Sequence, residues 1–212
     1  MPLRIGTLGG TTIDVDFSFL ILCALFVLRD FDSQQPERAI LWIPVILVSL
    51  LAHELAHAGT IGLLGLGSSH VILNGMGGVT INQRVARPWQ DLLISLAGPT
   101  ASLGVSAVVY LSGQNNPFLL MLLNINILWG LFNLMPVAPL DGGHAFRNFL
   151  RLFLDDRRAV QIAAVVGMIA GVAFIGWAAL RGEIYIAALM GFFTYLNFRH
   201  WRTAGAQPPD PE

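Results

Sequence analysis

The segment LLAHELAHAG places two histidines and a glutamate where one helix would present them together. His53 and His57 project from the same helical face, one turn apart, and two imidazoles so placed can share one metal ion. Glu54 lies beside them, where a carboxylate reaches a metal-bound water and takes its proton. Chance would produce this motif in about one chain of this composition in five hundred. The residues therefore predict zinc-dependent hydrolysis.

A third metal ligand must come from elsewhere, because a catalytic zinc has three protein ligands and one open position. The segment NLMPVAPLDGGH offers Asp141. Pro136 and Pro139 interrupt the preceding helix, and the pair Gly142-Gly143 permits a tight turn, so Asp141 is expected on irregular chain. Irregular backbone at membrane depth occurs inside protein or beside a water-filled cavity, and Asp141 is expected to line such a cavity.

The elements that carry these residues are membrane helices. Of 212 residues, 55% are apolar and only 12% are charged, about half the charge of a soluble domain. The apolar blocks approach the roughly 20 residues that a helix needs to cross a bilayer. We expect an all-α polytopic membrane protein with a small membrane-associated β-sheet. Its six helices are expected near 17–28, 39–64, 92–111, 118–135, 160–180 and 184–198.

Membrane energetics support the metal site. Each charged group near a helix centre costs about 2.5 to 3.5 kcal/mol, and bound zinc, about 10 to 16 kcal/mol in small peptides, would offset that cost. Two buried histidines around a protonated Glu54 would be the alternative, but that alternative leaves the spacing unexplained. The helices 39–64 and 118–135 both run inward, so His53, His57 and Asp141 are expected on one side of the bilayer.

Shorter segments indicate the strands and an interfacial helix. Residues 3–15 alternate around Gly9-Gly10, and residues 69–83 hold two β-branched runs around a glycine-rich turn, which predicts a hairpin. Residues 145–158 have the apolar spacing of a helix lying in the membrane interface.

Arginine placement predicts the orientation. With six crossings, nine of the twelve basic residues fall on one side, which places both termini in the cytoplasm and suggests the plasma membrane. A net charge of -1 offers no face for nucleic acid. One domain is expected over 1–202 and a disordered tail over 203–212, without a removable signal peptide.

At this point the chain resembles the site-2 protease family of intramembrane zinc metalloproteases. The resemblance rests on HELAH, on N-x-x-P-x-x-x-L-D-G-G about eighty residues later, on NGMGGVT and on LAGPTAS. It implies one zinc per chain on His53, His57 and Asp141, with Glu54 activating water and Asn133 supporting substrate or oxyanion. The substrates would be transmembrane or membrane-associated proteins. The chain departs from the family pattern at two positions. It has Ser102 where many members have asparagine, and Ala138 where many members have proline. No PDZ or CBS segment is evident, so a compact member is expected.

Strand addition is the expected mode of substrate binding. A transmembrane substrate must unwind before hydrolysis, and its freed N–H and C=O groups need partners in an apolar setting. A sheet edge would supply them. The expected binding segment is the hairpin tip, with a free N–H at Val79 or Ile81. It consists of Asn74, Gly75, Met76, Gly77, Gly78 and Val79.

The sequence offers less support for functions other than proteolysis. A pseudoprotease that binds metal and clients without cleaving them would not need Glu54. A transporter would show matching interrupted helices in its two halves, and none is seen. A G-x-S-G motif for a serine protease and a second intramembrane aspartate for an acid pair are also missing from the sequence.

Overall fold

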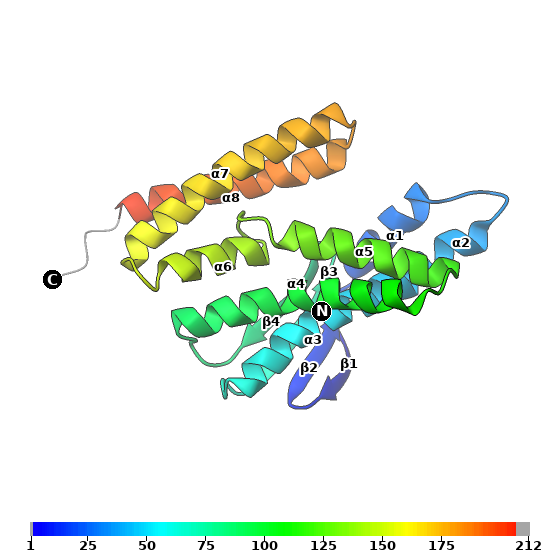
Figure 1. The fold of residues 1–212 in the computed structure, drawn as a ribbon, viewed down its shortest axis with the longest axis horizontal. Coiled ribbons are helices and arrows are strands. Elements are labelled where there is room, and N and C mark those ends of the chain that lie inside the picture. Colours follow the sequence, from blue (N-terminus) through cyan, green and yellow to red (C-terminus); the bar gives the residue numbers. More distant parts are fainter. Residues whose placement is uncertain (1, 207–212) are drawn as a thin grey trace. The chain divides into compact units, whose positions relative to one another are not determined.

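The computed structural model describes residues 2–206, which form two compact units (Figure 1). Of the described residues, the first unit comprises 2–86 and 97–131, and the second comprises 87–96 and 132–206. Helices α4 (Pro88–Ser112) and α5 (Pro117–Asn133) contribute residues to both units. The expectation of one domain over 1–202 stays a prediction.

A four-stranded sheet in the first unit positions the hairpin. Strands β1 (Leu3–Leu8) and β2 (Thr11–Val15) pair antiparallel, as do β3 (Ser69–Asn74) and β4 (Gly77–Asn82). Both predicted strand pairs are therefore confirmed. They join into one sheet because β2 pairs parallel with β3, and the strand order β1-β2-β3-β4 leaves β4 at an edge.

Alternate residues of β3 attach the sheet to the helices of the first unit. Val71 and Leu73 are fully buried among side chains of α1 (Phe19–Arg29) and α3 (Trp42–Leu63). Burial of each such side chain contributes about 1.5 to 3 kcal/mol. The short helix α2 (Pro36–Ile40) precedes α3. The helix that carries the histidine motif is thus held by the sheet on which the hairpin is built.

A buried polar contact joins α5 to α3. The Asn126 side chain donates a hydrogen bond of 2.8 Å to Ser49 Oγ, one turn before His53, and Ser49 donates to its own helix at Val45. Asn124, on the same helix, is exposed and donates a hydrogen bond to the Leu120 carbonyl of α5.

The second unit contains α6 (Asp141–Leu150), α7 (Asp156–Leu180) and α8 (Ile184–Ala206). Helices α7 and α8 form an antiparallel pair (Figure 1). Asn197 of α8 binds the loop before α6, because its amide donates to the Ala138 carbonyl at 2.8 Å and its oxygen accepts from the Ala138 N–H at 3.3 Å. These bonds fix the loop that leads to Asp141.

Two predicted boundaries are wrong. The single interfacial helix expected at 145–158 is two elements, since α6 ends at Leu150 and Asp155 caps α7 by accepting a hydrogen bond of 2.8 Å from the Arg158 N–H. Residues 203–206, expected in the tail, continue α8, while 207–212 lie outside the described residues.

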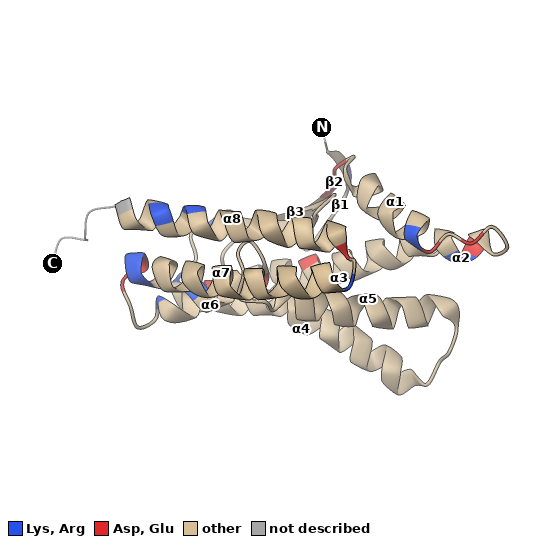
Figure 2. Cartoon of the chain, turned by 90° about the horizontal axis from the view of Figure 1, so that it is seen from above, with Lys and Arg blue, Asp and Glu red and all other residues tan. Residues whose placement is uncertain are grey.

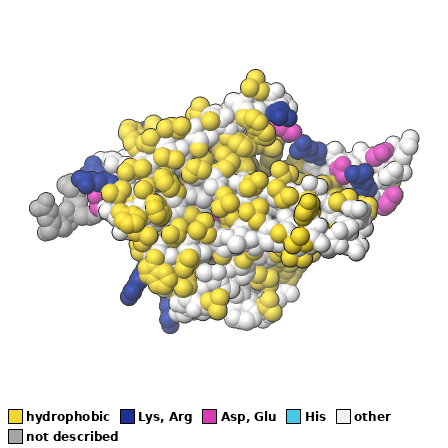
Figure 3. Space-filling view, in the orientation of Figure 1, with side chains coloured by type: hydrophobic (Ala, Val, Ile, Leu, Met, Phe, Trp, Pro, Cys, Tyr) yellow, Lys and Arg dark blue, Asp and Glu magenta, His cyan; other side chains and the backbone are white. Residues whose placement is uncertain are grey.

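Among the described residues, three helical segments are long and apolar enough to cross a membrane. They are Pro36–Leu63, Pro88–Ser112 and Asp156–Leu180. Helices α1 and α5 are apolar but shorter, so the count of six crossings stays a prediction. Hydrophobic side chains cover a large part of the face visible in Figure 3, and exposed apolar surface of this extent is typical of a membrane or protein contact.

Candidate metal centre

Helix α3 brings together the three predicted residues His53, Glu54 and His57. Their ligand atoms all lie within 4.8 Å of one another, and the imidazole rings meet edge to face with centroids 4.9 Å apart. The residues are only 2%, 4% and 6% exposed. A buried cluster of two imidazoles and a carboxylate on one helical face is suited to a divalent metal such as zinc.

Gly98 of α4 leaves the space that such an ion needs. A Cβ atom at this position would collide with the Nε2 atoms of both His53 and His57. Both nitrogens therefore face a volume that is open only because residue 98 has no side chain. The donor types, their convergence and this space together fit a bound metal ion.

Ser102, one turn after Gly98, orients the first histidine. Its hydroxyl lies 3.0 Å from His53 Nδ1, and Ser102 is fully buried. A partner on Nδ1 fixes the ring orientation and directs Nε2 toward the space beside Gly98. Sequence reasoning noted Ser102 only as a departure from asparagine. The sequence feature that could have indicated its role is a serine placed one helical turn from a glycine in an apolar helix.

Thr80 of β4 holds the carboxylate of Glu54. Its hydroxyl lies 2.6 Å from Oε2 and donates to it, with the main-chain carbonyl of Glu54 at 3.2 Å. Gly78 lies against the same side chain, since a Cβ there would overlap Glu54 Cγ, Cδ and Oε1. Strand β4 thus packs directly on the expected general base, a contact that the sequence indicated only as proximity.

The ladder register shows which groups of β4 face outward. The pair Asn74 and Gly77 closes a two-residue loop, and hydrogen-bonded pairs alternate from there along the antiparallel ladder. Gly78 and Thr80 therefore direct their N–H and C=O groups away from β3. Val79 and Ile81 belong to the alternate pairs, so their N–H groups point toward β3. The expectation of an outward N–H at Val79 or Ile81 is therefore wrong.

The remaining predicted residues, Asn133 and Asp141, lie in the second unit. Asn133 is the last residue of α5, and Asp141 is the first residue of α6. Asp141 is thus helical, not on irregular chain as predicted. Gly142 and Gly143 are helical as well, and they let the preceding loop pack against α6, because a Cβ on either would collide with main-chain atoms of residues 134–138.

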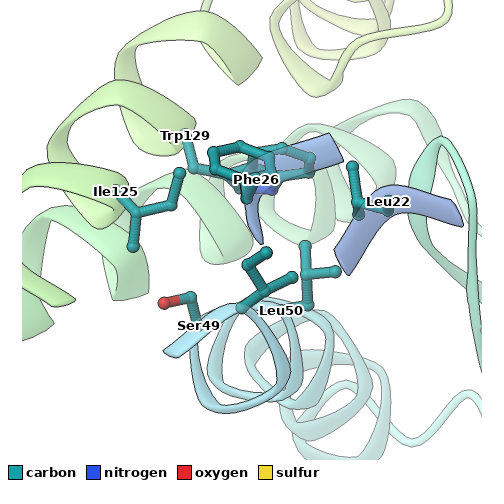
Figure 4. A pocket seen from close by; sticks show the side chains of 7 residues that line it. Leu22, Phe26, Ser49, Leu50, Ile125 and Trp129 are labelled. Carbon is teal, nitrogen blue, oxygen red and sulfur yellow. The ribbon is translucent and has the colours of Figure 1, made fainter. Parts of the chain in front are cut away.

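An apolar cavity lies before the metal motif on α3, between α1, α3 and α5 (Figure 4). Leu22, Phe26, Leu50 and Trp129 are among its lining residues. Its volume is only about 10 Å³, roughly that of one water site. In this conformation the cavity is too small for a substrate side chain.

Comparison with known proteins gives matches along most of the chain. The model of peptidase family M50 matches residues 112–175. A protein of Mycobacterium tuberculosis described as putative zinc metalloprotease Rip3 is 31% identical over 94% of this chain and 58% of its own length. Zinc metalloprotease MJ0392 of Methanocaldococcus jannaschii is 26% identical over 92% of this chain and 59% of its own. The chain thus spans less than two thirds of these relatives.

The fold also matches a solved structure. The site-2 protease from Methanocaldococcus jannaschii aligns with a TM-score of 0.68 over 100% of this chain and 98% of that chain, at 20% sequence identity. The predicted resemblance is thus supported in sequence by the M50 model and the zinc metalloprotease relatives, and in fold by the site-2 protease structure.

Proposed function

We propose that this relative of the site-2 proteases is an intramembrane zinc metalloprotease that hydrolyses peptide bonds of transmembrane or membrane-associated proteins. The observation that carries the proposal is the buried cluster of His53, Glu54 and His57 facing Gly98. The cluster lies on a helix able to cross a membrane, where such groups are functional by default.

Side chains of the protein carry out the proton transfers and hold the catalytic groups in position. When bound, zinc would act as a Lewis acid that activates water and polarises the peptide carbonyl. Glu54 then takes the water proton and passes it to the leaving amine. Thr80 holds the Glu54 carboxylate in place, and Ser102 holds the His53 ring. Both hydrogen bonds are made by side chains of other elements, so the site is organised before substrate binds.

Asp141 completes the proposed ligand set, and Asn133 supports the substrate or the oxyanion. A carboxylate ligand beside two imidazoles is a common catalytic zinc set. Asp141 stands at the start of α6 after a loop fixed by Asn197, so its main chain is well anchored. One zinc per chain is expected.

Substrate is proposed to add as a strand to the outer edge of β4. Gly78 and Thr80 offer outward N–H and C=O groups on the strand that contacts Glu54. An unwound substrate segment would satisfy its own main-chain groups there. Residues Asn74 to Val79 then position the scissile bond near the metal. The proposed location is the plasma membrane, with both termini cytoplasmic.

The test is cleavage by the wild type and Glu54→Gln. Glutamine keeps the shape but accepts no proton, so the variant should retain zinc and lose cleavage. Membrane proteomes of cells carrying either form should differ by uncut proteins that accumulate with the variant and identify substrates. Glu37→Gln, an exposed position on α2, is the matched control. A pseudoprotease predicts no difference between wild type and Glu54→Gln, and that result would reject the proposal.

A further inference from the structure

A second cavity, which is polar, lies entirely within the second unit, between α6, α7 and α8. Its volume is about 90 Å³, enough for several waters or for a small tetrahedral oxyanion. Small apolar residues of α7 form one wall. The polar lining residues are His144, Arg147, Asn197, His200 and Thr203. Apart from Asn197, which holds the loop before Asp141, none of these residues has a role in the proposed hydrolysis.

Arg147 is the unusual member of this lining. Its Nε atom is buried, and within the part of the chain that the structure describes it has no hydrogen-bond partner. Burial is the main cause that lowers the pKa of the Arg147 guanidinium, and the nearby Arg151 lowers it further. A buried N–H donor left without an acceptor is costly, so such atoms normally have a hydrogen-bond partner.

The nearby acids are engaged with other arginines. Asp156 pairs with Arg151 at 2.6 Å, and Asp155 pairs with Arg158 at 3.3 Å. Asp91 acts on Arg147 electrostatically, but in the described chain it makes no ion pair with it within 4.0 Å. Among the described residues that line the cavity, Arg147 is a cation and none is a carboxylate.

We propose that this cavity binds a phosphate group. Arg147 would provide the charge-assisted hydrogen bonds, and His200 and Thr203 lie on the more exposed side of the cavity, where a ligand can enter. Asn197 is hydrogen-bonded to the Ala138 main chain, so this part of the cavity lining is rigid. The inference does not depend on the metal or on proteolysis.

The surroundings favour an anionic phospholipid headgroup as the source of that phosphate. Phe149 and Phe153, which follow Arg147 in the chain, are 46% and 72% exposed, as expected of side chains that enter lipid. Arginines gather at the C-terminal end of α8 and the beginning of α7 (Figure 2). Apolar contacts beside a group of cations attract anionic headgroups. Free inorganic phosphate shares the chemistry and is the second possible source.

The experiment compares two probes on the purified protein in neutral detergent and phosphate-free buffer. Native mass spectrometry measures retention of phosphatidylglycerol against phosphatidylcholine, and calorimetry measures inorganic phosphate. Arg147→Gln should weaken binding of the preferred probe at least tenfold. Arg202→Gln, an exposed arginine on α8, removes the same charge and should change binding less than twofold.

Ala164→Met provides a second variant that fills the cavity from α7 without changing charge, and it should also lose binding. Circular dichroism reports whether each variant is folded. Binding of phosphatidylglycerol alone assigns the lipid, and binding of inorganic phosphate alone assigns the free anion. Equal losses in Arg147→Gln and Arg202→Gln, or full binding by Ala164→Met, would overturn the site.

Discussion

The hydroxyl of Ser102 lies 3.0 Å from Nδ1 of His53, and neither residue is more than 2% exposed. This contact connects α4 to the metal motif of α3. Removing a partner of a metal-ligating histidine typically costs 10- to 100-fold in metal affinity. Ser102 is therefore expected to set zinc affinity without binding the ion itself.

Ser102→Ala should weaken zinc binding by about 10- to 100-fold, measured by competition with a chromogenic chelator. Ser102→Asn should restore part of the affinity, because an amide can also bond to Nδ1. Ser106→Ala is the matched control, since Ser106 is a buried serine on the next turn whose hydroxyl donates to the main-chain carbonyls of Ser102 and Leu123. Equal losses at both positions would mean that helix packing, not the histidine contact, determines affinity.

Gly98→Ala should abolish zinc binding, because the added Cβ would occupy the space in front of both Nε2 atoms. In an ordinary helix the same change stabilises by up to about 1 kcal/mol. Gly104→Ala on the same helix, where a Cβ meets nothing within 4 Å, should accordingly keep zinc and raise the melting temperature slightly. Zinc content by atomic emission distinguishes the two. Full zinc content in Gly98→Ala would place the ion elsewhere.

The sequence predicted which residues of α3 cluster together, but not the side chains of other elements that contact them. His53, Glu54 and His57 follow from helical spacing, which is a local property, and so do the strand pairs around their glycine turns. Ser102 and Thr80 are brought to the site by long-range packing of α4 and β4, and neither has a spacing relative to the motif that reveals it.

The error at Asp141 has a different cause. Proline and glycine nearby are typical of irregular chain, but here the two glycines lie inside α6 and permit close packing of the preceding loop. Propensity alone does not distinguish a glycine needed for a turn from one needed for contact. The third-ligand assignment therefore still depends on the family resemblance.

Thr80→Val should lower the cleavage rate about 10- to 100-fold, because a hydrogen bond to a charged group is worth about 1.5 to 3 kcal/mol. Valine has nearly the same shape but no hydroxyl, so Glu54 loses the 2.6 Å contact while zinc stays bound. Thr80→Ser should retain most activity. Thr60→Val, which removes a hydroxyl bonded to α3 main chain, is the control for general effects. Unchanged turnover in Thr80→Val would show that Glu54 needs no such partner.

Reporter fusions should place Arg202 and the 29–38 loop on opposite sides of the membrane. With six crossings, nine arginines fall on the side of the two termini and three on the other side, which favours cytoplasmic termini. A cytoplasmic reporter should be active at Arg202 and a periplasmic reporter within the loop. If both report the same side, α1, which has only 11 residues, does not cross and the orientation changes.

Thr80→Pro tests strand addition. Proline removes the outward N–H of β4 but no hydrogen bond to β3, and edge strands tolerate proline at such positions. The variant also lacks the hydroxyl, so it is compared with Thr80→Val, which keeps the N–H. Cleavage of a transmembrane substrate should fall at least tenfold further in Thr80→Pro than in Thr80→Val, with zinc content equal in both. Val79→Pro, which breaks the β3–β4 ladder, should instead destabilise the protein. If Thr80→Pro and Thr80→Val cleave at the same rate, substrate does not pair with this edge.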